Sequence, residues 1–439
     1  MNKDRFGRDT MIRRGRQGEM EALIDFADFA FSRPDPPPDF SRLLPKLYGS
    51  DAETAEQHLL VVPESGDDIL AAVYSGPLAL QPSESWWKQR VHEGEPVTGS
   101  APALSGNGIG TVSVHHRERG KSYMRELMHA AIRDMLQEGA AFSALSGQRQ
   151  RYAYYGYEPA GTDLSVSLDR DNYTKAYGRH YFEEGPEGEL RNYAEIQDEP
   201  ELAEQVFAVY EASHPWSSRT RDNWYVTAGS WGGPEVLVYL KEGQVQGYLI
   251  AGGSGGHRAV SEIGLKDPED AIPMIGLLLG RHQVQRAEVQ LACWQPDPAA
   301  RLFRIAAGYS IGSSLSLLIL DWAQMLKAGL MLKQALDGAR DGELRLAITD
   351  CPVGDKEQRL HIRVSKGKVR VDAIDLEDTK EAAAADAEII SIPYSLAVRM
   401  LWSPMSQVLL HELTPENRRK LNRTGWFPLP FSILPADRV

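Results

Sequence analysis

Hydrophobic residues recur along the chain with two periods, which predict alternating helices and strands. In residues 123–137 the apolar positions stand three or four apart, so one face of a predicted helix is apolar. Short apolar runs rich in β-branched residues, such as 111–114, predict strands. The first third reads as helix 12–31, strands 58–62, 69–74 and 111–114, helix 123–137 and strand 142–145. The polar, Gly-rich residues 83–110 predict a surface loop.

The second third repeats this order of elements. We predict helix 200–213, strands 236–241, 245–251 and 260–265, helix 271–282 and strand 287–294. Two segments with the same order of elements indicate an internal repeat. The repeat does not extend to the turn after the third strand, because residues 265–270 are acidic there and lack a glycine. Carboxylates would repel a phosphate group, so the second copy is expected to act as a scaffold.

The last third has a different pattern. It predicts helix 323–336, strands 344–350, 358–364, 368–371 and 387–392, and helices 394–401 and 415–422. Residues 425–431 are apolar and stiffened by two prolines. Such a tail is expected to be held against the rest of the protein.

Composition excludes several classes of function. With 439 residues, 42% hydrophobic and 25% charged, the chain is expected to form several soluble globular domains. A net charge of −13 disfavours nucleic-acid binding. No apolar run is long enough for a membrane span and no signal peptide is visible, so we expect a cytoplasmic protein without a membrane partner. Cys293 and Cys351 lack Cys-x-x-Cys partners, and His115 and His116 point to opposite faces of a strand, so no metal site is expected.

The segment 111–137 carries the clearest chemistry. A strand leads through a basic turn into a helix, whose first N–H groups lack intrahelical partners and attract anions. Arg117, Arg119 and Lys121 add positive charge to this turn. A Walker A loop would need Gly where His115 stands, and a dinucleotide motif would need more glycines than Gly120. The turn therefore suits a pyrophosphate.

Two motifs resemble those of the GNAT acetyltransferases. The spacing Arg117-x-x-Gly120-x-Ser122 is similar to their pyrophosphate loop, and residues 152–159 are similar to the aromatic corner that ends their fold. The resemblance implies acetyl-CoA as co-substrate. It also implies that Arg117, Arg119, Gly120, Lys121 and Ser122 hold its pyrophosphate, and that the strand containing Val112 and Val114 pairs with its pantetheine arm.

The order of the three segments resembles the "enhanced intracellular survival" (Eis) family. This resemblance implies an α/β (α+β) chain with tandem GNAT folds on mixed, mostly antiparallel sheets. They are a catalytic domain (1–162) and a degenerate one (163–321), followed by a sterol-carrier-protein-like domain (322–439). It also implies a homo-oligomer, either a trimer or a hexamer.

The same resemblance implies an activity. An acetyl group passes directly from acetyl-CoA to a primary amine of a cationic acceptor, which is an aminoglycoside, a polyamine or a protein lysine. Tyr152 matches the general acid, and a Tyr pKa of ~10 keeps it protonated at neutral pH. The α-carboxylate of Val439 matches the family's terminal base. The family usually ends in aromatic residues and this chain does not, so Asp437 is an alternative base. Tyr154, Tyr155 and Tyr157 are assigned to packing.

Several alternatives stay open. Glu21 and Asp25 share a helix face that either is solvated or lines a substrate pocket, and Trp86 and Trp87 belong either to the core or to a pocket wall. The chain can also be a lipid- or sterol-binding protein, or an inactive regulatory module. Lipid binding would require an apolar stripe to line a cavity and not a filled core: Leu396, Met400, Leu401, Val408 and Leu409.

Overall fold

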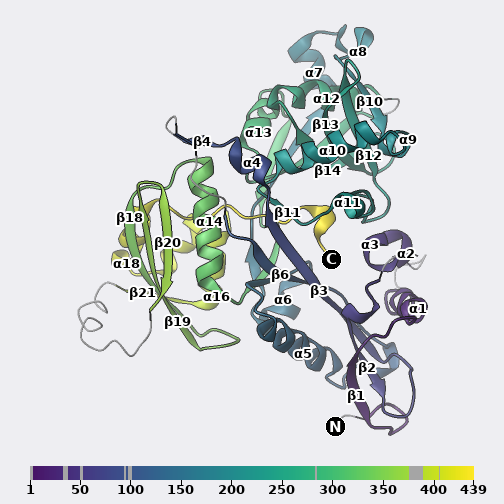
Figure 1. Cartoon of the computed structure of the whole chain (residues 1–439), viewed down its shortest axis with the longest axis vertical. Coiled ribbons are helices and arrows are strands. Elements are labelled where there is room, and N and C mark those ends of the chain that lie inside the picture. The colour runs from purple at the N-terminus through teal and green to yellow at the C-terminus, as the bar shows by residue number, and fades with distance from the viewer. Residues whose placement is uncertain are drawn as a thin grey trace.

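The computed structural model describes residues 3–32, 38–49, 53–92, 95–96, 101–281, 284–374, 389–404 and 406–439. These residues form three units, each built on a β-sheet (Figure 1). His282, at the end of one predicted helix, and residues 387–388 of one predicted strand lie outside the described residues. Among the residues that are described, no helix has the length and apolarity to cross a bilayer.

The first unit surrounds a mixed sheet with the strand order β1-β2-β3-β6-β7-β17-β8. Helix α5 packs on this sheet through the predicted stripe, and Leu127, Met128, Ala131 and Met135 are fully buried. The elements of this unit are β1 (Thr10–Arg14), α1 (Met20–Ala30), α2 (Phe40–Leu43), α3 (Pro45–Tyr48), β2 (His58–Pro63), β3 (Ala71–Pro82), α4 (Glu84–Lys88), β4 (Val91–His92), β5 (Glu95–Pro96), β6 (Leu104–Val114), α5 (Tyr123–Gln137), β7 (Phe142–Leu145), α6 (Arg149–Tyr152) and β8 (Glu158–Ala160).

The second unit has a sheet of the same design, with the order β10-β12-β13-β14-β15-β9-β16. Its elements are β9 (Asp163–Asp169), α7 (Arg170–Tyr177), α8 (Tyr181–Glu184), β10 (Glu189–Asn192), α9 (Tyr193–Ile196), α10 (Pro200–Ser213), β11 (Trp216–Ser217), α11 (Arg221–Ala228), β12 (Glu235–Lys241), β13 (Gln244–Gly252), β14 (His257–Leu265), α12 (Ala271–Gly280), β15 (Arg286–Ala292), α13 (Pro296–Phe303) and β16 (Gly308–Gly312).

The internal repeat is confirmed at the level of topology. In each sheet one parallel pair, β6–β7 or β14–β15, stands among antiparallel neighbours. The two units also exchange a strand. Strand β9 follows the first unit in sequence but lies between β15 and β16, whereas β17 (Leu315–Ile319) follows the second unit and lies between β7 and β8. The short strand β11 also pairs with β3 of the first sheet, so the range 163–321 includes two strands of that sheet, β11 and β17.

The third unit has a four-stranded sheet with the order β20-β19-β18-β21. Helix α14 packs against β20, and helices α16 and α18 contact β18 (Figure 1). The elements are α14 (Trp322–Leu336), β18 (Gly342–Thr349), β19 (Glu357–Ser365), β20 (Lys368–Ala373), β21 (Ile390–Pro393), α16 (Tyr394–Trp402), α17 (Ser406–Leu409) and α18 (Pro415–Thr424). From here the C-terminal tail runs back between the other two units.

Two sequence-based expectations are wrong in the first unit. The predicted helix 12–31 begins only at Met20, because Thr10–Arg14 form edge strand β1 against β2. The predicted loop 83–110 contains helix α4 and the first half of β6, whose residues Gly106 and Gly108 hide the strand pattern. Trp86 and Trp87 are buried in the core, and Glu21 and Asp25 are exposed.

Candidate active site

Strands β6 and β7 separate at the centre of the first sheet. They pair in parallel from Gly106–Phe142 to Ile109–Leu145, where β7 ends. Strand β6 continues to Val114 and pairs with β3 on its other side. Beyond Ile109 the β7-facing edge of β6 therefore has no ladder partner among the described strands. An extended ligand can add there as a strand would.

A β-bulge lies at the same level of β6. Gly110 faces Tyr74 of β3 and Ser113 faces Ala72, so Thr111 and Val112 stand opposite a single residue. Thr111 has a positive φ of 45°, which is uncommon for a β-branched residue. A bulge leaves backbone groups outside the ladder and often occurs beside an active site. Val112 and Val114 are half-buried at the edge of the opening.

The basic turn connects β6 to α5. Gly120 and Ser122 both have left-handed backbone conformations, with φ of 85° and 66°. Glycine adopts such a conformation without steric strain. At Gly120 this freedom of the backbone is what matters, because a Cβ there would meet no atom within 4 Å. Ser122 is the N-cap of α5, and Arg125 Nη2 donates to its Oγ at 2.9 Å. Sequence analysis missed Arg125, which adds a cation at the start of the helix.

The three predicted cations of the turn are not equivalent. Arg117 and Arg119 are exposed. The Nζ atom of Lys121 lies 2.8 Å from an Oε atom of Glu118, whose carboxylate is buried and also accepts from the Arg5 N–H at 3.2 Å. Lys121 therefore orders the turn through Glu118, and the two arginines carry more of its outward positive charge.

Tyr152 is the last residue of α6, the helix that follows β7 in the sequence. Its ring packs on the backbone of Gly147, where a Cβ would lie 2.6 Å from Tyr152 Cε2. Burial raises the pKa of the Tyr152 hydroxyl above its usual value. Among its neighbours, Tyr155 and Tyr157 are buried as predicted, and the Tyr157 hydroxyl donates to Ser143 Oγ at 2.8 Å. Tyr154 is 87% exposed, so its assignment to packing is wrong.

The C-terminal residue lies against a glycine face of β6. Gly106, Gly108 and Gly110 alternate along the strand and therefore point to one side. A Cβ on Gly108 would lie 2.8 Å from Val439 Cγ2, and one on Gly110 would lie 3.0 Å from the Val439 carboxyl carbon. The glycines thus make room for Val439 and bring its α-carboxylate next to the bulge.

The alternative base, Asp437, is engaged elsewhere. Arg219 donates to both of its carboxylate oxygens, at 2.7 and 3.3 Å. The Arg219 charge helps to hold the pKa of this buried carboxyl below its usual value, against the opposing effect of burial. Asp437 is therefore a structural ion-pair partner.

A polar chain lies behind the bulge. His58 Nδ1 donates to the Thr54 carbonyl at 2.9 Å, which leaves Nε2 to accept from the Tyr48 hydroxyl at 3.0 Å. The Tyr48 oxygen in turn accepts from Thr111 Oγ1 at 2.7 Å. Nearby, the Asp28 carboxylate accepts from the Phe40 N–H at 2.9 Å. Burial, with the neighbouring Asp39 and Asp25, raises the pKa of Asp28.

We expect acid to remove a stabilising contribution of His58. Burial lowers the pKa of His58 to about 4, whereas an unfolded His titrates near ~6.5. As the pH falls from ~6.5 to 4, the unfolded state binds a proton that the folded state does not, so stability decreases. The difference in free energy of unfolding between wild type and H58Q should shrink by about 2 kcal/mol between pH 7.5 and 5. Urea titrations at both values measure it, and a pH-independent difference would contradict this origin.

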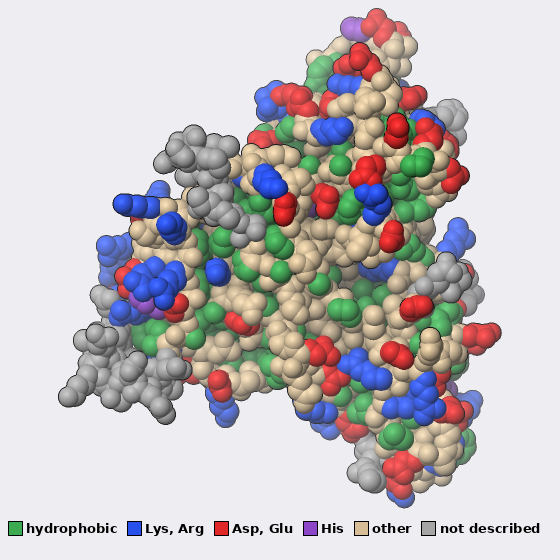
Figure 2. Space-filling model, in the orientation of Figure 1, with side chains coloured by type: hydrophobic (Ala, Val, Ile, Leu, Met, Phe, Trp, Pro, Cys, Tyr) green, Lys and Arg blue, Asp and Glu red, His purple; other side chains and the backbone are tan. Residues whose placement is uncertain are grey.

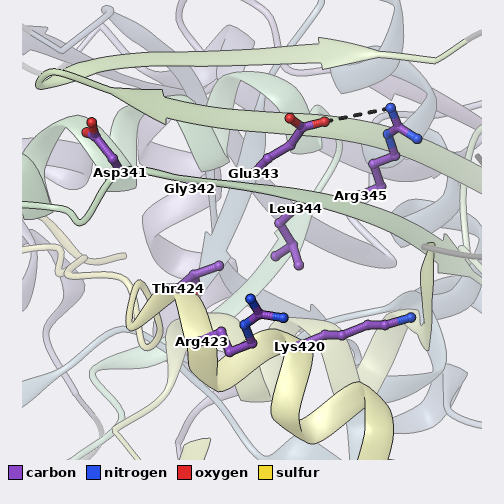
Figure 3. A pocket seen from close by; sticks show the side chains of 8 residues that line it. All are labelled: Asp341, Gly342, Glu343, Leu344, Arg345, Lys420, Arg423 and Thr424. Carbon is purple, nitrogen blue, oxygen red and sulfur yellow. Dashed lines mark ion pairs between the residues drawn. The ribbon is translucent and has the colours of Figure 1, made fainter.

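The third unit has a separate cavity of about 410 Å³ between β18 and α18 (Figure 3). Charged side chains from both elements surround it, among them Glu343, Arg345 and Arg423. Of the apolar stripe that a lipid tunnel would need, Leu396, Met400 and Leu401 are buried in the core and Val408 is 57% exposed. Three residues of the stripe therefore belong to the core, which disfavours the lipid-binding alternative.

Charged side chains cover most of the visible surface. Figure 2 shows acidic and basic groups interspersed over the first and second units, and basic groups gathered over the strands of the third unit. The surface therefore has no single strongly basic face in this view, in keeping with the net charge of −13.

Comparisons with known proteins agree with this geometry. Residues 98–160 match the family model of an acetyltransferase (GNAT) domain, a range that contains β6, the basic turn, α5 and Tyr152. The chain therefore carries a GNAT acetyltransferase domain and is an enzyme of the acetyltransferase class. No curated protein matches it.

Solved structures resemble the whole chain. A GCN5-related N-acetyltransferase from Kribbella flavida is similar with a TM-score of 0.60, 16% identity and 97% coverage of both chains. A GCN5-related N-acetyltransferase from Anabaena variabilis has a TM-score of 0.61, 14% identity, and coverage of 97% of this chain and 98% of its own. Eis1 from Mycobacterium abscessus has a TM-score of 0.56, 15% identity, and coverage of 97% and 99%. At such identities the likeness shows a shared fold.

Proposed function

We propose that the chain transfers an acetyl group from acetyl-CoA to a primary amine of a cationic acceptor. The observation that carries this proposal is the meeting of three features at one point of the first sheet. They are the opening between β6 and β7, the basic turn before α5, and the carboxylate of Val439 beside the bulge.

Acetyl-CoA would lie across the opening. Its pyrophosphate would contact the N–H groups from Gly120 onward and the side chains of Arg117 and Arg119, because a helix N-terminus with added cations favours an anion. Its pantetheine arm would run along the free edge of β6 at Val112 and Val114. The thioester would then lie near the bulge, whose backbone N–H groups can stabilise an oxyanion.

The transfer itself would be direct. The neutral amine attacks the thioester carbonyl, a C–N bond forms, and the amine proton passes to the α-carboxylate of Val439. The C–S bond then breaks and Tyr152 protonates the departing thiolate. The raised pKa of Tyr152 keeps this proton in place before the reaction. Asp437 is disfavoured as the base because its carboxylate is paired with Arg219.

The acceptor is proposed to be cationic because the Asp28 carboxylate lies beside the apolar cluster that contains Val439. Phe40, Tyr48 and Val439 belong to one apolar cluster, and Asp28 accepts from the backbone of Phe40. A carboxylate with a raised pKa gains from a nearby ammonium group. Aminoglycosides, polyamines and protein lysines all offer such a group.

A free-thiol assay tests this function. Acetyl-CoA is supplied with kanamycin, neomycin, spermidine or a lysine peptide, and CoA release is followed. We expect release to depend on at least one amine and to saturate with it. Absence of release with every amine, together with no acetyl-CoA binding by calorimetry, would refute the proposal.

Gly110→Ala should impair the reaction without affecting the donor. The added Cβ would lie 3.0 Å from the Val439 carboxyl carbon and 3.1 Å from its Cβ, so the terminal residue must shift. A displaced base lowers kcat, here by about tenfold, while KM for acetyl-CoA stays near the wild-type value. Gly312→Ala is the matched control, because a Cβ there meets nothing within 4 Å. Equal kcat values for the two variants would contradict the placement of the carboxylate.

We also propose a cytoplasmic homo-oligomer, a trimer or a hexamer. The composition supports the location, and the resemblance to the Eis family supports the assembly. Edge strand β16 leaves Tyr309 and Ile311 67% and 53% exposed, which suits contact with another copy. Light scattering coupled to gel filtration tests the assembly, and a monomer at micromolar concentration would exclude it.

A further inference from the structure

Side chains from the first and the second unit hold the last residues of the chain through hydrogen bonds and ion pairs. Arg219, between β11 and α11, is 4% exposed, and its guanidinium binds two carboxylates at once. It donates to Asp437 in the tail and, at 3.0 and 2.7 Å, to both oxygens of Glu262 on β14. The Tyr248 hydroxyl donates to the same Glu262 at 2.7 Å. Bidentate pairs of this kind fix orientation as well as distance.

A second donor to the tail comes from the first unit. Lys46 of α3 donates from its Nζ atom to the carbonyl oxygens of Ala436 and Arg438, each at 2.7 Å. These carbonyls belong to the two residues on either side of Asp437. Lys46 of the first unit and Arg219 of the second unit therefore bind the same short segment of the tail. Asp437 and Glu262 thus share the charge of Arg219, and burial lowers the pKa of Lys46 to about 7. The Lys46 amino group donates hydrogen bonds to the two carbonyls in either protonation state.

The segment is also fixed on its other flank. Arg438 donates from Nη2 to Asp163 at the start of β9, at 2.5 Å, and from Nε to the Ile433 carbonyl at 2.9 Å. Ser432 Oγ donates to the other Asp163 oxygen at 2.9 Å. Val439, by contrast, is held at its side chain by the glycine face of β6. The polar contacts of the tail thus extend to Arg438, which is bonded to Val439.

We propose that Lys46 and Arg219 form a latch that positions the α-carboxylate of Val439 in the active site. The second unit, whose acidic turn after β14 does not suit a pyrophosphate, thereby gains a role: it supplies Arg219 and Glu262, which hold the tail. Lys46 and Arg219 are positioning residues, since they act on the reaction through Val439. The catalytic role of the latch rests on the proposed function. The contacts by which Lys46 and Arg219 hold the tail do not depend on it.

Two variants loosen the latch without leaving a large cavity. Asp437→Asn removes the charge that pairs with Arg219, and Lys46→Met removes the donor to both carbonyls but keeps the length of the side chain. We expect each to lower kcat by about tenfold with KM for acetyl-CoA within about twofold of wild type. The matched controls are Asp337→Asn and Lys88→Met, which remove surface partners of Lys333 and Glu84. The controls should keep the wild-type kcat.

A measurement without catalysis tests the hold on the tail. Carboxypeptidase should release Val439 and Arg438 at least about tenfold faster from the two latch variants than from the wild type and the controls, because release follows the population of the open tail. This readout stays informative even if no amine acceptor is found, so failure of the latch and failure of the proposed function are distinguishable. Release at the wild-type rate from both variants would overturn the latch.

A double-variant comparison tests its purpose. In a chain that lacks Val439, Asp437→Asn should have no further effect on kcat, because the group that it positions is gone. A further tenfold loss in that background would overturn the positioning role and assign Asp437 to general stability. Faster carboxypeptidase release with unchanged kcat would likewise overturn it.

Discussion

Replacing Tyr152 by Phe should lower kcat by about 10²- to 10⁴-fold, the usual range for loss of a general acid. The leaving CoA thiolate then has no positioned proton donor. The ring still packs on Gly147, so the opening between β6 and β7 should keep its shape and KM for acetyl-CoA should change little. Initial rates of CoA release at saturating amine measure the effect.

The exposed Tyr154 provides the control for this variant. It lies two residues further along the same turn with 87% of its surface exposed, so Tyr154→Phe should leave kcat unchanged. A Tyr152→Phe enzyme with kcat within about threefold of wild type would remove Tyr152 from the chemistry and leave it a packing role.

Deletion of Val439 is expected to have the second-largest effect. The new terminus would be Arg438, whose side chain is bound to Asp163 and whose carboxylate would lie one residue short of the bulge. We expect kcat/KM for the amine to fall by about 10²-fold, because a base displaced by several ångströms no longer reaches its proton. The measurement is the same CoA-release assay over a range of amine concentrations.

A second terminal variant separates charge from packing. One Gly added after Val439 keeps the Val side chain against β6 but moves the carboxylate onward by one residue. A loss similar to that of the deletion would assign the effect to the carboxylate. If both variants retain the wild-type kcat/KM, the terminal carboxylate takes no part in the reaction.

The periodic part of the sequence predicted the elements that position the donor site. Helix α5 and strand β7 have the bounds that their apolar patterns indicate, Tyr123–Gln137 and Phe142–Leu145. Local patterns succeed here because burial of one helix face or of a short strand is read directly from neighbouring residues. The acidic turn after β14 was likewise visible from residues 265–270.

Long-range features could not be predicted from the sequence, for physical reasons. The alternating glycines of β6 led to the prediction of a loop. In the fold these positions need glycine because Phe142 and Val439 occupy the space beside them. The exchange of β9 and β17 depends on pairing between units, which no local period encodes. The pairing of Lys121 with Glu118 and of Arg219 with Asp437 also appears only once the chain is folded.

Acetyl transfer to an amine can be tested by analysis of the products. The purified protein is incubated with acetyl-CoA and the amine that gives the fastest CoA release, and acetylated amine and free CoA are both quantified by mass spectrometry. We expect one acetyl group on the amine for each CoA released, with formation of both strongly reduced by Tyr152→Phe. CoA release without acetylated amine, or equal product from the Tyr152→Phe enzyme, would contradict this expectation.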